Sequence, residues 1–318
     1  MKESTQASRG KNANWPGRDP RRGWKDVLLR IKDEVGNDNL SIVSAGVAFF
    51  ALFAIFPAIT ALVTLYGLVT TPDQAEQHLA PLHDLLPGSA FDILADQTRQ
   101  VASVATGSLG FGLVLSLGLA IWSANAGTKS IITALNIAYE EKEKRGFIRL
   151  SLCSIAFTIS GILFVIVALT VIAAVPAALA FLDFDPGLAQ SLLLMLRWVL
   201  MAALMAVGLA FLYRYAPSRR PAKLQWLSPG AIAATLLWLA ASIGFSLYVR
   251  HFGTYDKTFG SLGAVVILLM WFYISAYVVC LGAELNAELE RQTHRDSTIG
   301  PEKPIGERDA FVADNKLA

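Results

Sequence analysis

Two stripes of polar side chains interrupt long apolar stretches and are the residues best placed to do chemistry. The first stripe consists of Asn125, Lys129, Asn136 and Tyr139, and the second of Tyr273, Tyr277, Cys280, Glu284 and Glu288. On an α-helix each stripe falls within an arc of about 80°. Polar groups inside a membrane are costly and often functional, so the pattern predicts that the stripes line a polar cavity.

Two charged members of these stripes, one from each, are predicted to meet. Lys129 and Glu284 lie toward the same membrane level, and we expect them to form a partly buried ion pair at a cavity that faces the cytoplasm. The alternative is that such a pair only fastens two helices together.

Three further residues stand out inside apolar stretches or at their ends. Arg197 is predicted to hold an anionic headgroup or a substrate phosphate, with snorkelling to the interface as the alternative. Pro57 removes one backbone hydrogen bond and is a candidate hinge, although a simple packing kink is the more usual outcome. Asp38 is interpreted as an N-cap at the start of a helix, with a proton carrier as the less favoured alternative.

The sequence gives no motif for a metal, a cofactor or catalysis. The chain has four histidines, His78, His83, His251 and His294, and none lies in a ligand motif. His78 and His83 are five residues apart, which turns them about 140° from each other on a helix. The basic segments are short and lack interleaved aromatic residues, so no nucleic-acid partner is expected. We predict a protein that is not an enzyme and has no metal or cofactor.

The elements that carry these residues are predicted to be membrane-spanning helices. Hydrophobic residues make up 54% of the 318-residue chain and charged residues 16%, against about 25% charged residues in soluble proteins. A helix needs about 20 apolar residues to cross the hydrocarbon layer. Six runs are long enough, and only Arg197 interrupts one of them: 40–72, 100–128, 150–182, 192–213, 224–249 and 258–283. The predicted fold is all-α, a polytopic membrane protein with six transmembrane helices.

The orientation follows from where lysine and arginine are concentrated. Nine lie before residue 33, whereas the segment 70–107 contains only Arg99. The same alternation continues through the later connections, and basic residues are retained in the cytoplasm during insertion. Both termini are therefore predicted to be cytoplasmic.

The domain organisation is predicted to be simple. Residues 1–24 are a basic segment and residues 291–318 a cytoplasmic tail; both are expected to be disordered, because they are rich in polar and charged residues. Residues 25–290 form the membrane domain. Its first outside loop is expected to contain two short amphipathic helices, 75–86 and 89–102.

Three segments resemble the YihY/BrkB family of bacterial inner-membrane proteins, once labelled ribonuclease BN. They are DNLSIVSAGVAFFALFAIFPAIT (38–60), IWSANAGTKSIITALNIAYEEKEKRGFIR (121–149), and the stretch from Ser228 through FGSLGAVVILLMWFYISAYVVCLGAELNAELE to Glu290. Phe259 stands where many members of the family have tyrosine. The resemblance implies a six-span fold in the bacterial inner membrane, and little settled chemistry.

Two functions are compatible with these features. The leading hypothesis is transport of a lipid, an ion or a small polar solute through the polar cavity, with membrane lipids as the other partners. No intramembrane acidic cluster of the kind that proton-coupled carriers use is apparent in the sequence. The alternative is a non-catalytic protein that organises the cell envelope. We reject the ribonuclease label, because no metal-ligand motif is present.

Overall fold

The computed structural model describes residues 21–69, 109–181, 188–252 and 261–316. These residues form α-helices and one isolated β-bridge, between Ala222 and Thr298. The helices are α2 (Arg21–Asn37), α3 (Leu40–Val69), α6 (Leu109–Ala138), α7 (Phe147–Phe181), α8 (Leu188–Tyr215), α9 (Leu224–Phe252), α11 (Ser261–Gln292) and α12 (Phe311–Asp314). The all-α prediction is confirmed for these parts of the chain.

Four helical segments are long and apolar enough to cross a membrane. They are Phe147–Ala168, Trp198–Tyr215, Leu224–Val249 and Gly263–Gln292. A fifth candidate arises if α2 and the first half of α3 count as one broken span, because the two are bent by 63° at the break between them. The described residues thus contain four to five candidate spans, while six spans and the orientation of the termini stay predictions.

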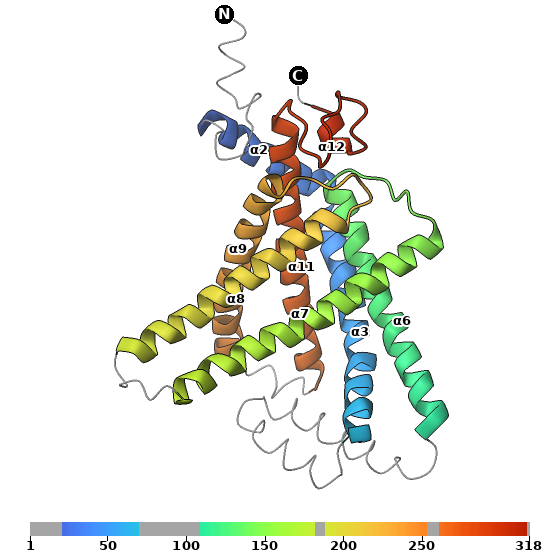
Figure 1. Ribbon diagram of the computed structural model, residues 1–318, viewed down its shortest axis with the longest axis vertical. Helices are drawn as coiled ribbons and strands as arrows, with labels where there is room; N and C mark the ends of the chain where they lie inside the picture. Colours follow the sequence, from blue (N-terminus) through green and yellow to red (C-terminus); the bar gives the residue numbers. More distant parts are fainter. Residues whose placement is uncertain (1–20, 70–108, 182–187, 253–260, 317–318) are drawn as a thin grey trace, which may run out of the picture.

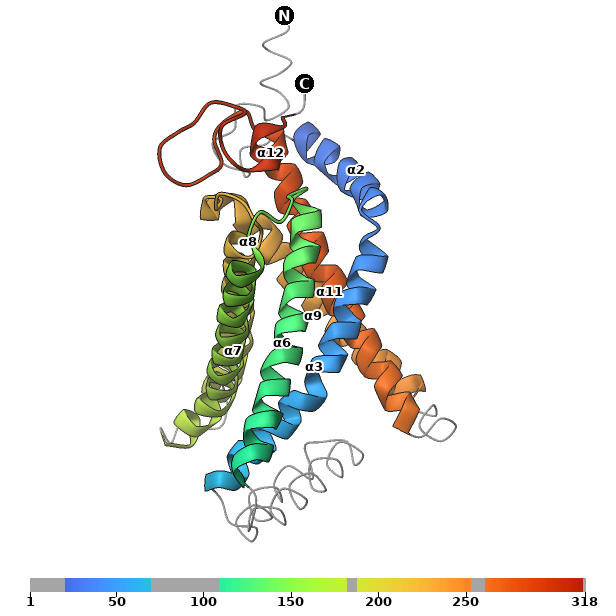
Figure 2. The same cartoon turned by 90° about the vertical axis from the view of Figure 1, so that its right-hand side faces the viewer.

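Three pairs of long helices lie side by side, α3 with α6, α7 with α8, and α9 with α11, and the contact of α6 with α7 joins the first pair to the second. Helix α11 also packs on α3 and α2, and α8 packs on α9. Figures 1 and 2 show that the pairs converge at the end of the molecule that carries α2 and α12, and spread apart toward the opposite end. We call the converging end the α2/α12 end.

The outer surface of α7 and α8 is strongly apolar. Ile162, Met195, Trp198, Val199 and Val207 are all more than half exposed. A contiguous apolar surface on several helices is unusual for a protein in water and is what contact with lipid requires. These helices therefore present a surface suited to the bilayer.

The tightest helix contact joins α9 to α11 near the α2/α12 end. Gly230 and Gly282 face each other there, and a Cβ atom on either residue would meet the other's backbone. The backbone N–H of Gly230 donates to Oδ1 of Asn286 at 2.8 Å. Small residues let helices approach closely in membranes, where packing contributes most of the association energy.

Helix α2 is an amphipathic element at the α2/α12 end. Val27 and Ile31 are buried against Trp226 and Leu289, and Trp24 packs beside them. The chain then turns into α3 through Asn39, whose φ of 49° is a conformation that asparagine tolerates better than most residues. This turn sets α2 at a steep angle to α3.

The tail differs from its predicted disorder, because residues 293–316 fold against the end of α11. The guanidinium group of Arg308 is 5% exposed and donates to the carbonyl oxygens of Arg295, Ala313 and His294 at 2.9–3.1 Å. Thr298 donates from both its backbone and its side chain to Asp296, at 2.9 and 2.7 Å. Bonds from side chains to the backbone stabilise this segment, which composition alone does not reveal.

We expect docking of the tail to depend on pH through Lys316, the last described residue. Lys316 Nζ donates to the carbonyl oxygens of Glu290, at 2.7 Å, and Val312, at 3.1 Å. Burial lowers the pKa of Lys316 to about 7, whereas a free lysine has a pKa of about 10.4. Between pH 7 and 10 the undocked tail binds more protons than the docked tail, so docking strengthens as pH rises, by up to about 5 kcal/mol.

We therefore expect the amides of residues 293–316 to exchange more slowly with deuterium at pH 9 than at pH 7, after correction for intrinsic rates. Lys316→Met should remove this pH dependence, and Lys303→Met, at an exposed position, should keep it. An equal pH dependence in Lys316→Met would show that this amine does not control docking.

Candidate functional site

The predicted site residues of α6 at the membrane level are used in contacts with α7. Asn125 Oδ1 accepts a hydrogen bond from the hydroxyl of Ser154. Lys129 Nζ donates to Ser151 Oγ at 3.0 Å and lies 5.0 Å from the centre of the Phe147 ring. Both side chains therefore fasten α6 to α7.

The remaining two residues of this stripe, at the end of α6 and just after it, organise the connections at the α2/α12 end. Asn136 is 5% exposed; its Nδ2 donates to Glu143 at 3.0 Å, and its Oδ1 accepts the backbone N–H of Ser218 at 2.8 Å. Tyr139 is fully buried, and the guanidinium of Arg219 lies 4.6 Å from the centre of its ring. These residues tie the end of α6 to the α8–α9 connection.

The loop after α6 is held by a partly exposed charged pair. Arg145 Nε donates to Glu143 Oε1 at 2.7 Å. These hydrogen bonds stabilise the carboxylate and lower the pKa of Glu143 to about 2. Glu143 is therefore ionised throughout the physiological range.

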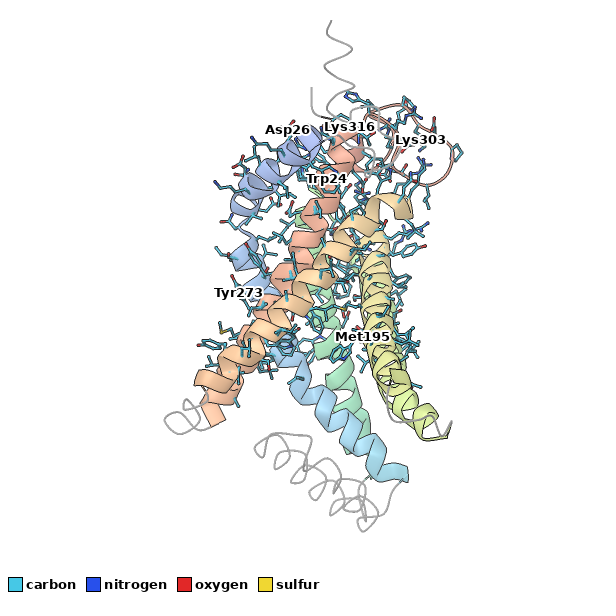
Figure 3. All side chains as sticks on the ribbon, turned by 90° about the vertical axis from the view of Figure 1, so that its left-hand side faces the viewer. Trp24, Asp26, Met195, Tyr273, Lys303 and Lys316 are labelled. Atoms are coloured by element: carbon cyan, nitrogen blue, oxygen red, sulfur yellow. The ribbon has the colours of Figure 1, made fainter. Side chains whose placement is uncertain are left out.

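The α11 stripe faces α3 and α2. The rings of Tyr273 and Tyr277 lie 6.1 Å apart, and Tyr277 packs on a cluster that includes Leu40 and Val47 of α3. Figure 3 shows Tyr273 farther from the α2/α12 end than Trp24 and Lys316 are. Glu284 and Glu288, one and two turns beyond Cys280, are each 1% exposed. The stripe thus runs from half-buried aromatic rings to buried carboxyl groups.

The predicted pair between Lys129 and Glu284 is wrong. Lys129 bonds to Ser151 on α7, whereas Glu284 contacts the carboxyl group of Asp38 between α2 and α3. The two stripes point to different neighbours, because α6 turns its polar face to α7 and α11 turns its own to α2 and α3. Asp38 is the residue that we interpreted as an N-cap, and its carboxyl group lies against that of Glu284.

The cavity near these stripes is apolar, in contrast to the polar cavity predicted from the sequence. It has a volume of about 160 Å³ and lies among α3, α6, α8 and α11. Its lining is Val47, Ala51, Ile131, Ala134, Leu135, Leu212, Phe272, Ser275, Ala276, Val279 and Cys280. Cys280 is the one described stripe residue in this lining, and the other described stripe residues lie in contacts with neighbouring segments of the chain.

An ionic network joins α2 to the end of α11. Arg30 bonds to Glu288 and donates to Gln292 at 2.8 Å. Arg291 pairs with Glu288 at 3.0 Å, with Glu34 at 3.6 Å and with Glu140 after α6. Two arginines thus compensate several carboxylates from three parts of the chain.

A second buried pair lies on the other side of α11. Arg219 Nη2 donates to both carboxylate oxygens of Glu290 at 2.8 Å, and their side chains are 1% and 0% exposed. Ser297 Oγ also donates to Glu290 at 2.9 Å. Sequence reasoning did not single out Arg219 or Glu290 as functional residues, and no local pattern shows that they meet.

Several predicted features lie outside what the structure can place. The side chains of Pro57 and Arg197 are outside the described residues, so their roles as hinge and anion ligand stay predictions. The same holds for the loop helices 75–86 and 89–102 and for residues 1–20. Among the side chains that are described, no three histidine, cysteine, aspartate or glutamate residues gather as metal ligands.

The comparisons with known proteins establish the family. The family model described as "Virulence factor BrkB" matches residues 31–306. The chain belongs to this family, which confirms the resemblance found in the sequence. Together with its apolar helices, the membership identifies the chain as a membrane protein.

Individual relatives cover most of the chain. "Putative ribonuclease-like protein YfkH" of Bacillus subtilis is 32% identical over 254 residues, which are 78% of this chain and 90% of that protein. A UPF0761 membrane protein of Rhodospirillum centenum is 28% identical over 299 residues, 89% of this chain and 64% of that protein. A UPF0761 membrane protein of Pseudoalteromonas translucida is 25% identical over 294 residues, 90% and 91% of the two chains. No solved structure matches the chain.

Proposed function

We propose that this protein is a bacterial inner-membrane protein that moves a lipid, or another molecule with a large apolar part, between its helices. The observation that carries this proposal is the apolar cavity among α3, α6, α8 and α11. Apolar cavities of roughly 150 Å³ stay dry and bind apolar molecules. Of the three cargoes considered from the sequence, this lining suits an acyl chain better than an ion or a polar solute.

The proposed topology is six spans with both termini in the cytoplasm. The α2/α12 end brings together α2, the loop 139–146, the loop 216–223 and the folded tail (Figure 1). These segments contain the clusters of lysine and arginine that the sequence assigns to the cytoplasm. Their gathering at one end supports this orientation.

The test is lipid movement in vesicles that contain the purified protein. We expect fluorescent phospholipid to exchange between leaflets faster than in protein-free vesicles, and Ala276→Phe, which fills the cavity, to reduce the rate at least several-fold. Ala203→Phe on the exposed face of α8 is the matched control and should leave the rate unchanged. Equal rates with and without protein would contradict the proposal.

A structural role in the envelope is the second candidate, supported by the use of the described polar stripe residues in contacts between helices. Under this role the vesicle assay shows no lipid movement, while loss of the protein weakens the cell envelope. Our prediction that the chain is not a ribonuclease also stands as a proposal. RNA cleavage by highly purified protein would contradict it.

A further inference from the structure

Two carboxyl groups from distant parts of the chain are in contact at the α2/α12 end. Asp38 occupies the break between α2 and α3, and Glu284 lies on α11. The two carboxyl groups lie next to each other. An ionised carboxylate only accepts hydrogen bonds, so a bond between two carboxyl groups requires a proton on one of them.

The groups around this contact leave an excess of negative charge. Three further carboxyl groups surround the contact: Glu34 on α2, Glu288 on α11 and Glu140 in the turn after α6. Two arginines, Arg30 and Arg291, are nearby. Both arginines are already engaged. Arg30 bonds to Glu288 and Gln292, and Arg291 pairs with Glu34, Glu140 and Glu288. Five carboxyl groups therefore share two guanidinium groups.

The negative charge that Glu284 would carry as a carboxylate is not compensated by the groups around it. Its side chain is 1% exposed, and its Oε1 has no hydrogen-bond donor among the described residues. A buried carboxylate without a cation or donors is strongly destabilising. The described side chains offer no set of three metal ligands here, so a proton is the cation that fits.

We propose that Asp38 and Glu284 form a proton-binding site, in which the two carboxyl groups share one proton at neutral pH. When hydroxide removes this proton as water, two like charges remain in contact and push α11 away from the junction of α2 and α3. The site is thus an acidic cluster that was not apparent in the sequence. It goes beyond the proposed lipid movement and does not depend on it, because the proton is measured on the purified protein alone.

The test is infrared spectroscopy of the full-length protein in detergent micelles. We expect a carbonyl band of a protonated carboxylic acid at pH 7 that shifts in heavy water and disappears at alkaline pH. Glu284→Gln should abolish the band. Asp38→Asn should shift its loss to lower pH, because the repelling neighbour is gone. Glu143→Gln is the control and should leave the band unchanged, because Glu143 is ionised beside Arg145.

Thermal unfolding gives a second readout. The folded chain keeps a proton that the unfolded chain loses near pH 4. In the Lys316→Met background, which removes the opposite pH dependence of the tail, the melting temperature should therefore fall as pH rises toward the loss of the band. This dependence should be absent in Glu284→Gln. If Glu284→Gln does not fold, the lower pH at which Asp38→Asn loses the carbonyl band still tests the proposal.

Three results would overturn the proposal. They are the absence of the band at pH 7, its persistence in Glu284→Gln, and its removal by sodium, potassium or magnesium salts at constant pH with a rise in melting temperature. The last result would identify a site for a metal cation instead of a proton.

Discussion

Replacing Arg219 by methionine is expected to lower the free energy of unfolding by about 3–5 kcal/mol, the cost of leaving a buried charge without its partner. Arg219 and Glu290 are almost completely inaccessible to solvent, and one nitrogen of the guanidinium group holds both carboxylate oxygens at 2.8 Å. The guanidinium also covers the buried ring of Tyr139. The substitution therefore removes an ion pair and a cation–π contact together.

The measurement is thermal unfolding in detergent micelles, followed by tryptophan fluorescence. The double variant Arg219→Met with Glu290→Leu should recover part of the loss, because no unpaired charge then stays buried. Asp309→Asn provides the control: its partner Lys144 and Asp309 itself are 50% and 66% exposed, and exposed pairs contribute less than about 1 kcal/mol. If Arg219→Met melts at the same temperature as Asp309→Asn, the buried pair does not stabilise this end.

The sequence predicted the long helices because hydropathy is a local property. The apolar runs at 150–182, 192–213 and 224–249 correspond to α7, α8 and α9. The last predicted span ended at residue 283, whereas α11 continues to Gln292. Charged residues were read as the end of the span, yet Glu284 and Glu288 stay buried, because α2 and the α2–α3 break supply their partners.

Helical spacing identified the two stripes, but it could not identify the residues that they contact. Spacing shows which residues share a face of one helix and not which helix that face meets. Arg30 and Glu288 are 258 positions apart. Helix α2 itself could have been found, since Trp24, Val27, Ile31 and Val35 repeat at helical spacing. The tail could not, because Arg308 organises it through backbone carbonyls.

Gly230→Ala should destabilise the protein by about 3 kcal/mol, at the upper end of what overpacking usually costs. The new methyl group would lie against the carbonyl oxygen of Gly282 and 2.5 Å from Cγ of Asn286. A backbone carbonyl of α11 cannot rotate away, so α9 and α11 must separate, and the hydrogen bond from Gly230 to Asn286 is lost with their contact. The gain in helix propensity from glycine to alanine, about 1 kcal/mol, does not offset this cost.

Helix α9 contains its own control for this prediction. A Cβ atom at Gly244 would meet nothing within 4 Å, so Gly244→Ala should leave the melting temperature unchanged or raise it, since only the helix propensity changes. Both variants add one methyl group to the same helix and differ only in what that group touches. A Gly230→Ala protein as stable as the Gly244→Ala protein would mean that α9 and α11 are not in close contact at Gly230 and Gly282. The convergence of the helix pairs at the α2/α12 end would then need another cause.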